Sequence, residues 1–216
     1  MDGLIEKKKK ESRDKIITVA GDLFNRQGFE STTMDQIATE AAVARKTLYN
    51  YFPVKEAIAD AYARKISKDL ARTASKKLSD LPDIRSRLIA AISNSYNWAE
   101  MNPKLTHIVL MYRFKNLLQA TENKTENKFE LTGTQSIILE ILRKGQEQDE
   151  IRANIPVEMI FSYIDYLRTS TVLKWLKNDA RGDLREEISL FVDLILNGAS
   201  SNPGNILNNK VSGKKR

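Results

Sequence analysis

The apolar residues of this chain recur every three or four positions over most of its length, which is the period of an α-helix. The first such stripe contains Ile16, Ala20, Leu23 and Phe24, and it ends at Gly28, a residue type that often follows a helix directly. No segment alternates apolar and polar residues as a half-buried strand does. We therefore expect an all-α fold.

Breaks in the apolar pattern divide the chain into segments. Thr33 followed by Gln36 is a capping-box pattern that starts a second helix. We expect a short connection at residues 41–43 and a third helix up to Phe52. Pro53 fits the first turn of a fourth helix, which extends to about Leu78. Further helices are expected over residues 84–102, 105–119, 134–148, 156–178 and 184–196. The segment 121–128 is expected to be an exposed loop.

The composition excludes several classes of protein. There is no cysteine and His107 is the single histidine, so thiolate metal sites and most histidine-dependent catalysis are excluded. No nucleotide-binding loop or nucleophile motif is present, and no apolar run is long enough for a membrane span. We expect a cytoplasmic protein that is not an enzyme and that has no cofactor or metal.

Positive charge is concentrated near the ends of the chain. Residues 1–79 contain 16 Lys/Arg and 11 Asp/Glu, whereas residues 80–200 contain 15 and 17. A local basic excess favours an anionic polymer as partner. The runs Lys7–Lys10 and Lys214–Arg216 are expected to be solvated and disordered, although a basic N-terminal arm that reaches a minor groove is an alternative.

The second and third helices, with the three-residue connection, have the arrangement of a helix-turn-helix. At 100° per residue, Ala44, Leu48 and Phe52 share the inner face of the third helix. Its outer face centres on Lys46 and Asn50, with Thr47 and Tyr49 beside them and Arg45 at the start. These side chains can donate hydrogen bonds to bases and phosphates, so the outer face is a candidate DNA-reading surface.

A longer run of residues is similar to the DNA-binding domain of the TetR family. The similarity lies in Gly28-Phe29, Thr32 to Ala38, Ala42 to Ala44, Thr47 to Phe52 and Lys55-Glu56. It implies DNA contacts by Thr33, Arg45, Lys46, Thr47, Tyr49, Tyr51 and Lys55, beside Asn50 from the helical pattern. Two residues depart from the family pattern: Ala42 replaces the turn glycine, and Ala44 replaces the usual Ser or Thr cap. Because alanine is a poor N-cap, we expect the third helix to fray until DNA orders it.

The resemblance also implies a domain organisation. Residues 12–60 would form a three-helix DNA-binding domain, 61–82 the connecting part of a long helix, 83–198 a helical ligand-binding and dimerisation domain, and 199–216 a disordered basic tail. The expected function is that of a transcriptional regulator, more often a repressor, which binds a palindromic operator as a homodimer and is released by a small amphipathic ligand. The alternative is a DNA-binding regulator controlled by a protein partner or by DNA alone.

Two surfaces of the second domain are candidate sites. For the dimer interface we expect the apolar stripe of Ile188, Phe191, Val192 and Ile195, although a purely intramolecular core is an alternative. The candidate pocket consists of large side chains, although each taken singly is more often an ordinary core or structural residue: Tyr96, Trp98, His107, Met111, Tyr112, Phe114, Tyr163 and Tyr166. Asp165 is expected to pair with Arg168 rather than to bind a cation.

Overall fold

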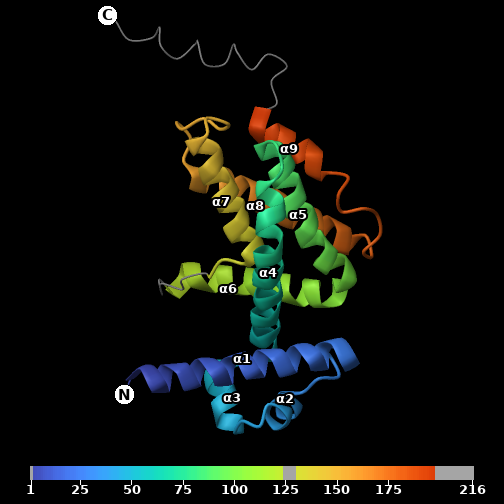
Figure 1. The fold of residues 1–216 in the computed structure, drawn as a ribbon. Coiled ribbons are helices and arrows are strands. Elements are labelled where there is room, and N and C mark those ends of the chain that lie inside the picture. Colours follow the sequence, from blue (N-terminus) through green and yellow to red (C-terminus); the bar gives the residue numbers. More distant parts are fainter. Residues whose placement is uncertain (1, 124–129, 198–216) are drawn as a thin grey trace, which may run out of the picture. The chain divides into compact units, whose positions relative to one another are not determined.

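The computed structural model describes residues 2–123 and 130–197, and within these the regular structure is entirely α-helical, which confirms the expected fold class (Figure 1). The helices are α1 (Asp2–Gln27), α2 (Met34–Glu40), α3 (Arg45–Tyr51), α4 (Lys55–Ser79), α5 (Ile84–Met101), α6 (Pro103–Asn123), α7 (Gly133–Glu147), α8 (Val157–Lys177) and α9 (Ile188–Asn197). None of these described helices is long and apolar enough to cross a membrane.

The chain divides into two compact units. The first comprises residues 1–72 and 99–133, and the second residues 73–98 and 134–216, so the division falls inside α4. The domain boundaries expected at residues 60 and 82 stay predictions.

The core of the first unit is built from the inward faces of α1, α2, α3 and α4. Ile16 and Leu23 of α1, Ile37 of α2, Leu48 of α3 and Ile58 of α4 are fully buried. Burying one such aliphatic side chain contributes about 1.5–3 kcal/mol relative to leaving it exposed. The inner stripe expected for α1 and the inner position expected for Leu48 are thus confirmed.

Polar and close contacts fasten α1 to α4. A Cβ atom on Gly21 would lie 2.1 Å from the ring of Tyr62, so glycine is needed where this ring crosses α1. Asn25 Nδ2 donates a hydrogen bond to Tyr62 Oη at 2.9 Å, and Lys65 Nζ donates one to Thr18 Oγ1 at 2.6 Å. These polar contacts add to the shared apolar core and hold α1 against the first turns of α4.

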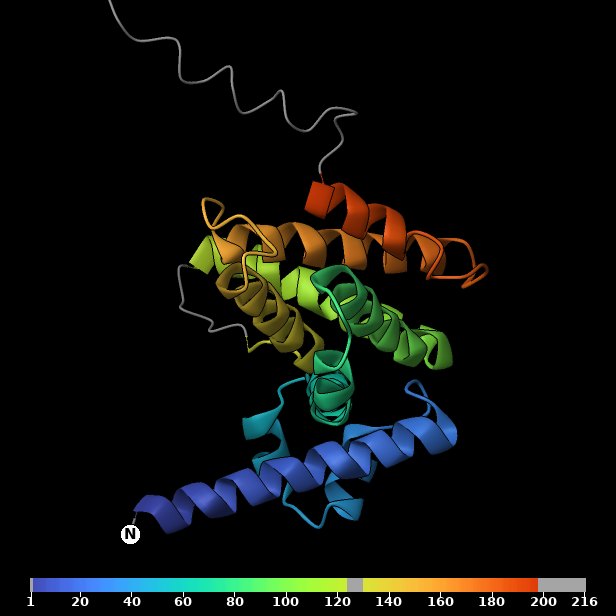
Figure 2. The same cartoon turned by 45° about the horizontal axis from the view of Figure 1, so that its top comes forward.

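Helix α1 begins earlier than the sequence analysis predicted. Residues 2–11, expected to be disordered around Lys7–Lys10, form its first turns, and the side chains of residues 3–11 are exposed. The spacing of Glu6 to Lys10 and of Lys7 to Glu11 is four residues, which favours a helix by offsetting the repulsion within the lysine run. This part of α1 extends beyond α2 and α3 in both views (Figures 1 and 2).

In the second unit, α8 packs against α9, and α5 is tied to α9 by an ion pair between Arg85 Nε and Asp193 Oδ1 at 2.6 Å. Tyr96 is fully buried, and its hydroxyl donates to the carbonyl of Arg168 at 3.2 Å. Burial raises the pKa of Tyr96 to about 12, so the phenol remains a neutral donor at physiological pH.

Two helix bounds of the sequence analysis need correction. The last helix begins at Ile188 rather than at Leu184, because the carboxylate of Asp183 accepts the backbone N–H of Arg185 at 2.8 Å and holds the preceding residues in turns. Helix α6 continues to Asn123, past the start of the loop expected at residues 121–128. The rest of that loop and the tail 199–216 lie outside the described residues.

Candidate nucleic-acid interface

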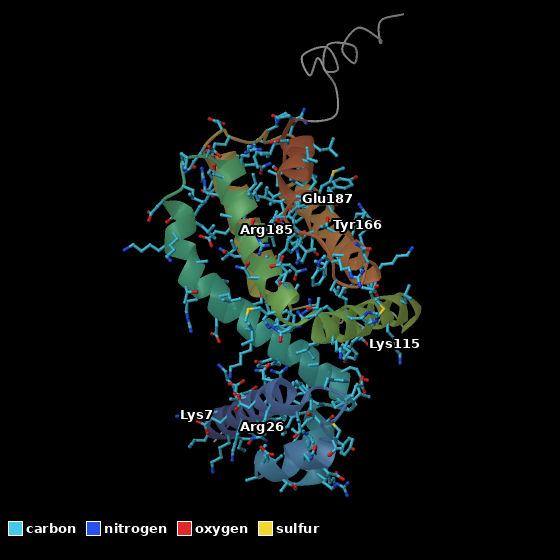
Figure 3. All side chains as sticks on the ribbon, turned by 90° about the vertical axis from the view of Figure 1, so that its right-hand side faces the viewer. Lys7, Arg26, Lys115, Tyr166, Arg185 and Glu187 are labelled. Atoms are coloured by element: carbon cyan, nitrogen blue, oxygen red, sulfur yellow. The ribbon has the colours of Figure 1, made fainter. Side chains whose placement is uncertain are left out.

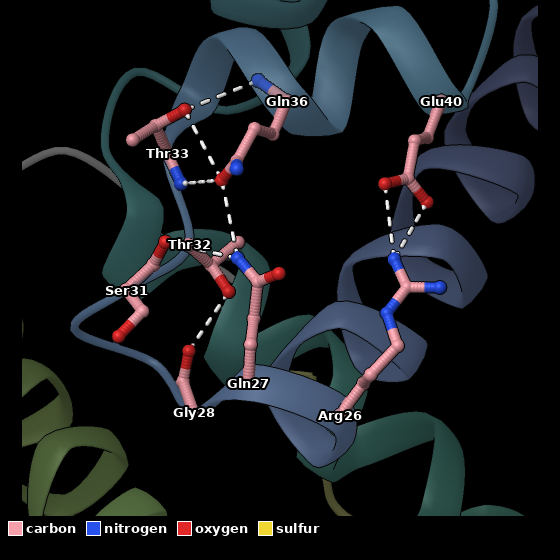
Figure 4. Close-up of polar contacts among 8 residues, drawn as sticks. All are labelled: Arg26, Gln27, Gly28, Ser31, Thr32, Thr33, Gln36 and Glu40. Atoms are coloured by element: carbon pink, nitrogen blue, oxygen red, sulfur yellow. Dashed lines mark hydrogen bonds and ion pairs between the residues drawn. The ribbon is translucent and has the colours of Figure 1, made fainter.

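The capping box expected at the start of α2 is confirmed. Thr33 Oγ1 accepts the backbone N–H of Gln36 at 3.2 Å, and Gln36 Oε1 accepts the backbone N–H of Thr33 at 2.9 Å. Gln27 Nε2 donates to the same Gln36 oxygen at 3.2 Å, and Arg26 pairs with Glu40 at 3.0 Å (Figure 4). Both ends of α2 are therefore tied to the end of α1, and the exposed Thr33 side chain is held at the first turn.

The connection between α2 and α3 adopts a conformation that usually needs glycine. Ala42 has φ 51°, and the backbone N–H groups of Val43 and Ala42 donate to the carbonyls of Ala38 and Thr39, each at 3.0 Å. This pair of bonds is a Schellman motif with Ala42 at the left-handed position. An alanine there costs about 1–2 kcal/mol in steric strain. The turn geometry is thus kept although its usual glycine is missing. Packing of the surrounding residues must offset the steric strain at Ala42.

Helix α3 presents the residues of the expected reading surface. Ala44 precedes it in an extended conformation with no side-chain cap, while Leu48 and Phe52 are buried on its inner side. Arg45, Lys46, Tyr49 and Asn50 are exposed, and Thr47 and Tyr51 are half-buried. Within the part of the chain that the structure describes, Lys46 and Asn50 have no side-chain hydrogen bond or ion pair.

Arg45 has an intramolecular partner that the sequence analysis did not anticipate. Its Nε and Nη2 donate to the two carboxylate oxygens of Asp35, in the first turn of α2. These hydrogen bonds and the charge of Asp35 hold the pKa of Arg45 above its ordinary value. Both side chains are more than half exposed, so solvent screens the pair and it adds little to stability. A base or phosphate that takes Arg45 must therefore displace Asp35 at little energetic cost.

Lys55 has two backbone partners in the structure, and its expected phosphate contact stays a prediction. Its Nζ donates to the carbonyls of Phe29 at 2.6 Å and Thr32 at 2.7 Å, and it lies 4.1 Å from the centroid of the Phe29 ring. These carbonyls belong to the loop between α1 and α2. The sequence resemblance assigned Lys55 to a phosphate; in the structure its ammonium group joins the start of α4 to this loop.

The eight candidate pocket residues are distributed over both compact units. Tyr96 is fully buried, and Trp98 and Tyr112 are half-buried. His107, Met111 and Phe114 of α6 are exposed. Tyr163 and Tyr166 of α8 are 54% and 71% exposed, whereas Ile160 and Ile164 of the same helix are buried, so these two tyrosines lie on the exposed side of α8. Tyr166 is labelled in Figure 3. A pocket lined by all eight residues stays a prediction, and the two outward tyrosines do not fit its interior.

The residues expected at the dimer interface lie mostly inside the subunit. Ile188, Phe191 and Val192 are buried without any partner chain, and Ile195 is half-buried. The helical pattern identified an apolar stripe correctly, but most of the stripe is buried within the subunit, where α9 packs against α8. The exposed apolar residues of α9 are instead Leu190 and Leu194. Asp165 pairs with Arg168 at 2.7 Å as expected, and the described residues contain no cluster of acidic or histidine side chains that could hold a metal.

Comparison with known proteins connects these features to a family. The model of "Bacterial regulatory proteins, tetR family" matches residues 16–62, which extend from the first core residue of α1 into α4. An uncharacterized HTH-type transcriptional regulator of Mycobacterium tuberculosis is 33% identical over 92 residues, which are 43% of this chain and 46% of that protein. The chain thus spans about half the length of this relative.

Two further comparisons extend over most of the chain. The fatty acid metabolism regulator protein of Bacillus subtilis is 24% identical over 196 residues, which cover 89% of this chain and 97% of that protein. The crystal structure of Thermus thermophilus FadR, a TetR-family transcriptional repressor in complex with lauroyl-CoA, is similar with a TM-score of 0.71 and 26% identity, covering 87% of this chain and 95% of that one. All three proteins are named as regulators, in agreement with the expectation that the chain is not an enzyme.

The role of Lys55 generates a prediction about stability. Lys55→Met keeps the apolar stem but removes the donor to two carbonyls, and we expect the free energy of unfolding to fall by about 1.5–3 kcal/mol, as for a lost charged hydrogen bond. Urea denaturation measures this change. Lys46→Met is the matched control and should change stability by less than about 0.5 kcal/mol, because Lys46 is exposed. Equal stability of both variants and the wild type would show that Lys55 does not hold the loop.

Proposed function

We propose that this chain, whose residues 16–62 match the model of the TetR family of bacterial regulatory proteins, is a cytoplasmic transcriptional repressor that binds an operator through α3 and is released by a small amphipathic ligand. The observation that carries this proposal is the outer face of α3. Lys46 and Asn50 are exposed and engaged by no other described side chain, on a helix whose opposite face is anchored by the fully buried Leu48. Lysine can donate to guanine and asparagine can pair with adenine in the major groove.

The DNA contacts of the proposal fall into two groups. Lys46 and Asn50, together with Arg45 once it leaves Asp35, are suited to base edges. Thr33, Thr47, Tyr49 and Tyr51 are suited to phosphates through their hydroxyl groups. Lys55 is left out of the primary contacts because its ammonium group already has two carbonyl partners.

A second copy of the chain is the proposed partner of α8 and α9. Met159, Tyr163 and Tyr166 follow one face of α8 and are 49%, 54% and 71% exposed. Leu190 and Leu194 of the adjacent α9 are 72% and 48% exposed. Exposed apolar side chains on two helices that pack together can be covered by the same surface of a second subunit. Two reading helices related by a twofold axis would then address a palindromic operator.

The proposed ligand class is an acyl-coenzyme A, which combines an apolar chain with an anionic head. The class comes from the similar Thermus repressor, and two features of α6 support it. Met111, Phe114 and Leu117 are 42%, 40% and 50% exposed and offer apolar surface. The hydroxyl of Thr106 is buried with no hydrogen-bond partner in the described part of the chain. An unsatisfied buried hydroxyl costs about 1–3 kcal/mol, which a ligand acceptor could recover.

A route from ligand to DNA runs through an ion pair within the first unit. Arg113 Nε of α6 lies 2.5 Å from Asp60 Oδ1 of α4, and Arg64 Nε lies 2.8 Å from Asp60 Oδ2. Asp60 is buried, so the position of Arg113 is coupled to the position of α4. A ligand that moves α6 would thereby move α4, which begins directly after α3.

For DNA binding, we expect Lys46→Ala to weaken the binding free energy by about 1–3 kcal/mol on a duplex selected from a random library, because a contact to a base is removed. The same variant should weaken binding to unselected duplex much less. Fluorescence anisotropy measures both affinities. Lys76→Ala, which removes the same charge from an exposed position of α4, should leave the ratio of the two affinities unchanged. A wild type that fails to bind double-stranded DNA would overturn the proposed function itself.

For assembly, we expect a dimer at micromolar concentration that Leu190→Glu dissociates, since the variant would bury an unpaired charge in the interface. Sedimentation velocity measures the association. Phe191→Glu is the contrasting variant, because it should lower the thermal stability of the subunit itself. A monomeric wild type, or a dimer that Leu190→Glu leaves intact, would remove α9 from the interface.

For regulation, we expect lauroyl-CoA to lower the affinity for the selected duplex by about 5- to 150-fold, which corresponds to a coupling of about 1–3 kcal/mol. Arg113→Met should still bind lauroyl-CoA, measured by fluorescence of Trp98 and Trp175, but should transmit less of this change to DNA. Coenzyme A without the acyl chain is the control. If lauroyl-CoA does not bind, the regulator without a small-molecule ligand becomes the better interpretation.

A further inference from the structure

The N-terminal extension of α1, residues 2–11, is an ordered helix with no described partner. The side chains of residues 3–11 are all exposed, and they include the run Lys7–Lys10. Residues 2–11 contain these four lysines and three acidic residues, Asp2, Glu6 and Glu11, so the positive charge is concentrated in the lysine run itself. The family match begins at Ile16 and does not include it.

A contact between α1 and the end of α3 locates this surface relative to the reading helix. The guanidinium of Arg13 lies 5.2 Å from the centroid of the Phe52 ring, and Phe52 is the residue at which α3 ends. Helical residues are spaced about 1.5 Å along the axis, so Lys9 lies about 6 Å beyond this contact and Lys7 about 9 Å. The extension therefore overhangs the C-terminal end of α3, as both ribbon views show (Figures 1 and 2).

The helical phase separates the four lysines into two pairs. Lys9 is four residues before Arg13 and therefore on the same face of α1, the face that carries the buried Ile16 and Ala20. Measured around the helix from Arg13, which contacts Phe52, Lys9 lies at about 40° and Lys10 at about 60°, whereas Lys7 and Lys8 lie at about 120° and 140°. Lys7 and Lys8 point to the other side, and Lys7 is labelled on the flank of α1 in Figure 3.

The ordered conformation decides which part of DNA the extension can reach. A flexible basic arm could enter a minor groove, but an α-helix with side chains is about 10–12 Å across, whereas the minor groove is only about 6 Å wide. Lysine ammonium groups on a rigid overhang can instead approach phosphates from outside the duplex. Such contacts carry no sequence information and strengthen binding in a salt-dependent way.

We propose that Lys9 and Lys10 of the α1 extension bind the phosphate backbone of the operator duplex beside the segment that α3 reads. The overhang enlarges the DNA-binding surface beyond the helix-turn-helix without adding base readout. This inference rests on the proposed DNA binding, because it places phosphates next to the end of α3.

The test compares two variants with the same loss of charge. Lys9→Gln/Lys10→Gln and Lys7→Gln/Lys8→Gln each remove two positive charges, and glutamine preserves the helix because its helix propensity is close to that of lysine. Binding is measured by fluorescence anisotropy on a mixed-sequence duplex of about 40 base pairs, roughly four helical turns, over a series of salt concentrations.

The first variant should lower the salt dependence of log K by about 2 and the affinity at low salt on the order of tenfold, whereas the second should change both much less. The ratio of affinities for selected and mixed-sequence duplex should stay the same in both variants. Equal effects of the two variants would show that the extension acts only through its net charge, which would overturn the assignment of Lys9 and Lys10. If neither variant has an effect, the proposal is overturned as well. A wild type that binds no duplex would instead overturn the proposed function, so the two failures are distinguishable.

Discussion

A helix of seven residues cannot maintain itself in water, because the cost of its first turn is recovered only over about 12–15 residues. Helix α3 also lacks a side-chain N-cap and follows an alanine in the left-handed region. Its shape therefore depends on burial of Leu48, which is fully enclosed in the first unit. The same burial fixes the rotation of α3, so Lys46 and Asn50 point outward because Leu48 points inward.

Intramolecular partners decide which basic side chains of the first unit remain available for DNA. Arg45 is held by Asp35, Lys55 by the carbonyls of Phe29 and Thr32, and Lys65 by Thr18. The exposed pair of Arg45 is weak and can exchange for DNA, whereas the two carbonyl bonds of Lys55 belong to a half-buried junction. Two lysines near each other in the sequence thus differ in role: Lys55 stabilises the fold, whereas the exposed Lys46 remains free for DNA.

Much of the local structure followed from short-range rules. The Thr33–Gln36 capping box, the end of α1 at Gly28 and the inner face of α3 each depend on residues within one or two helical turns, and all three were predicted correctly. The apolar stripe of α9 that contains Phe191 was recognised for the same reason, but the surface that covers this stripe was not predicted correctly. Helical periodicity shows that a face is apolar, whereas burial of that face by α8 or by a second subunit depends on residues far away in the chain.

The sequence by itself determined the all-α fold, the helix-turn-helix and the resemblance to the TetR family, because rise and rotation per residue are the same in every α-helix. Tertiary structure alone decided that Asp35 holds Arg45, that Lys55 joins α4 to the loop after α1, and that Asp60 binds Arg113 of α6. These partners are between 10 and 53 residues apart. Contacts over such separations form only after the core has brought the helices together, and therefore no local pattern encodes them.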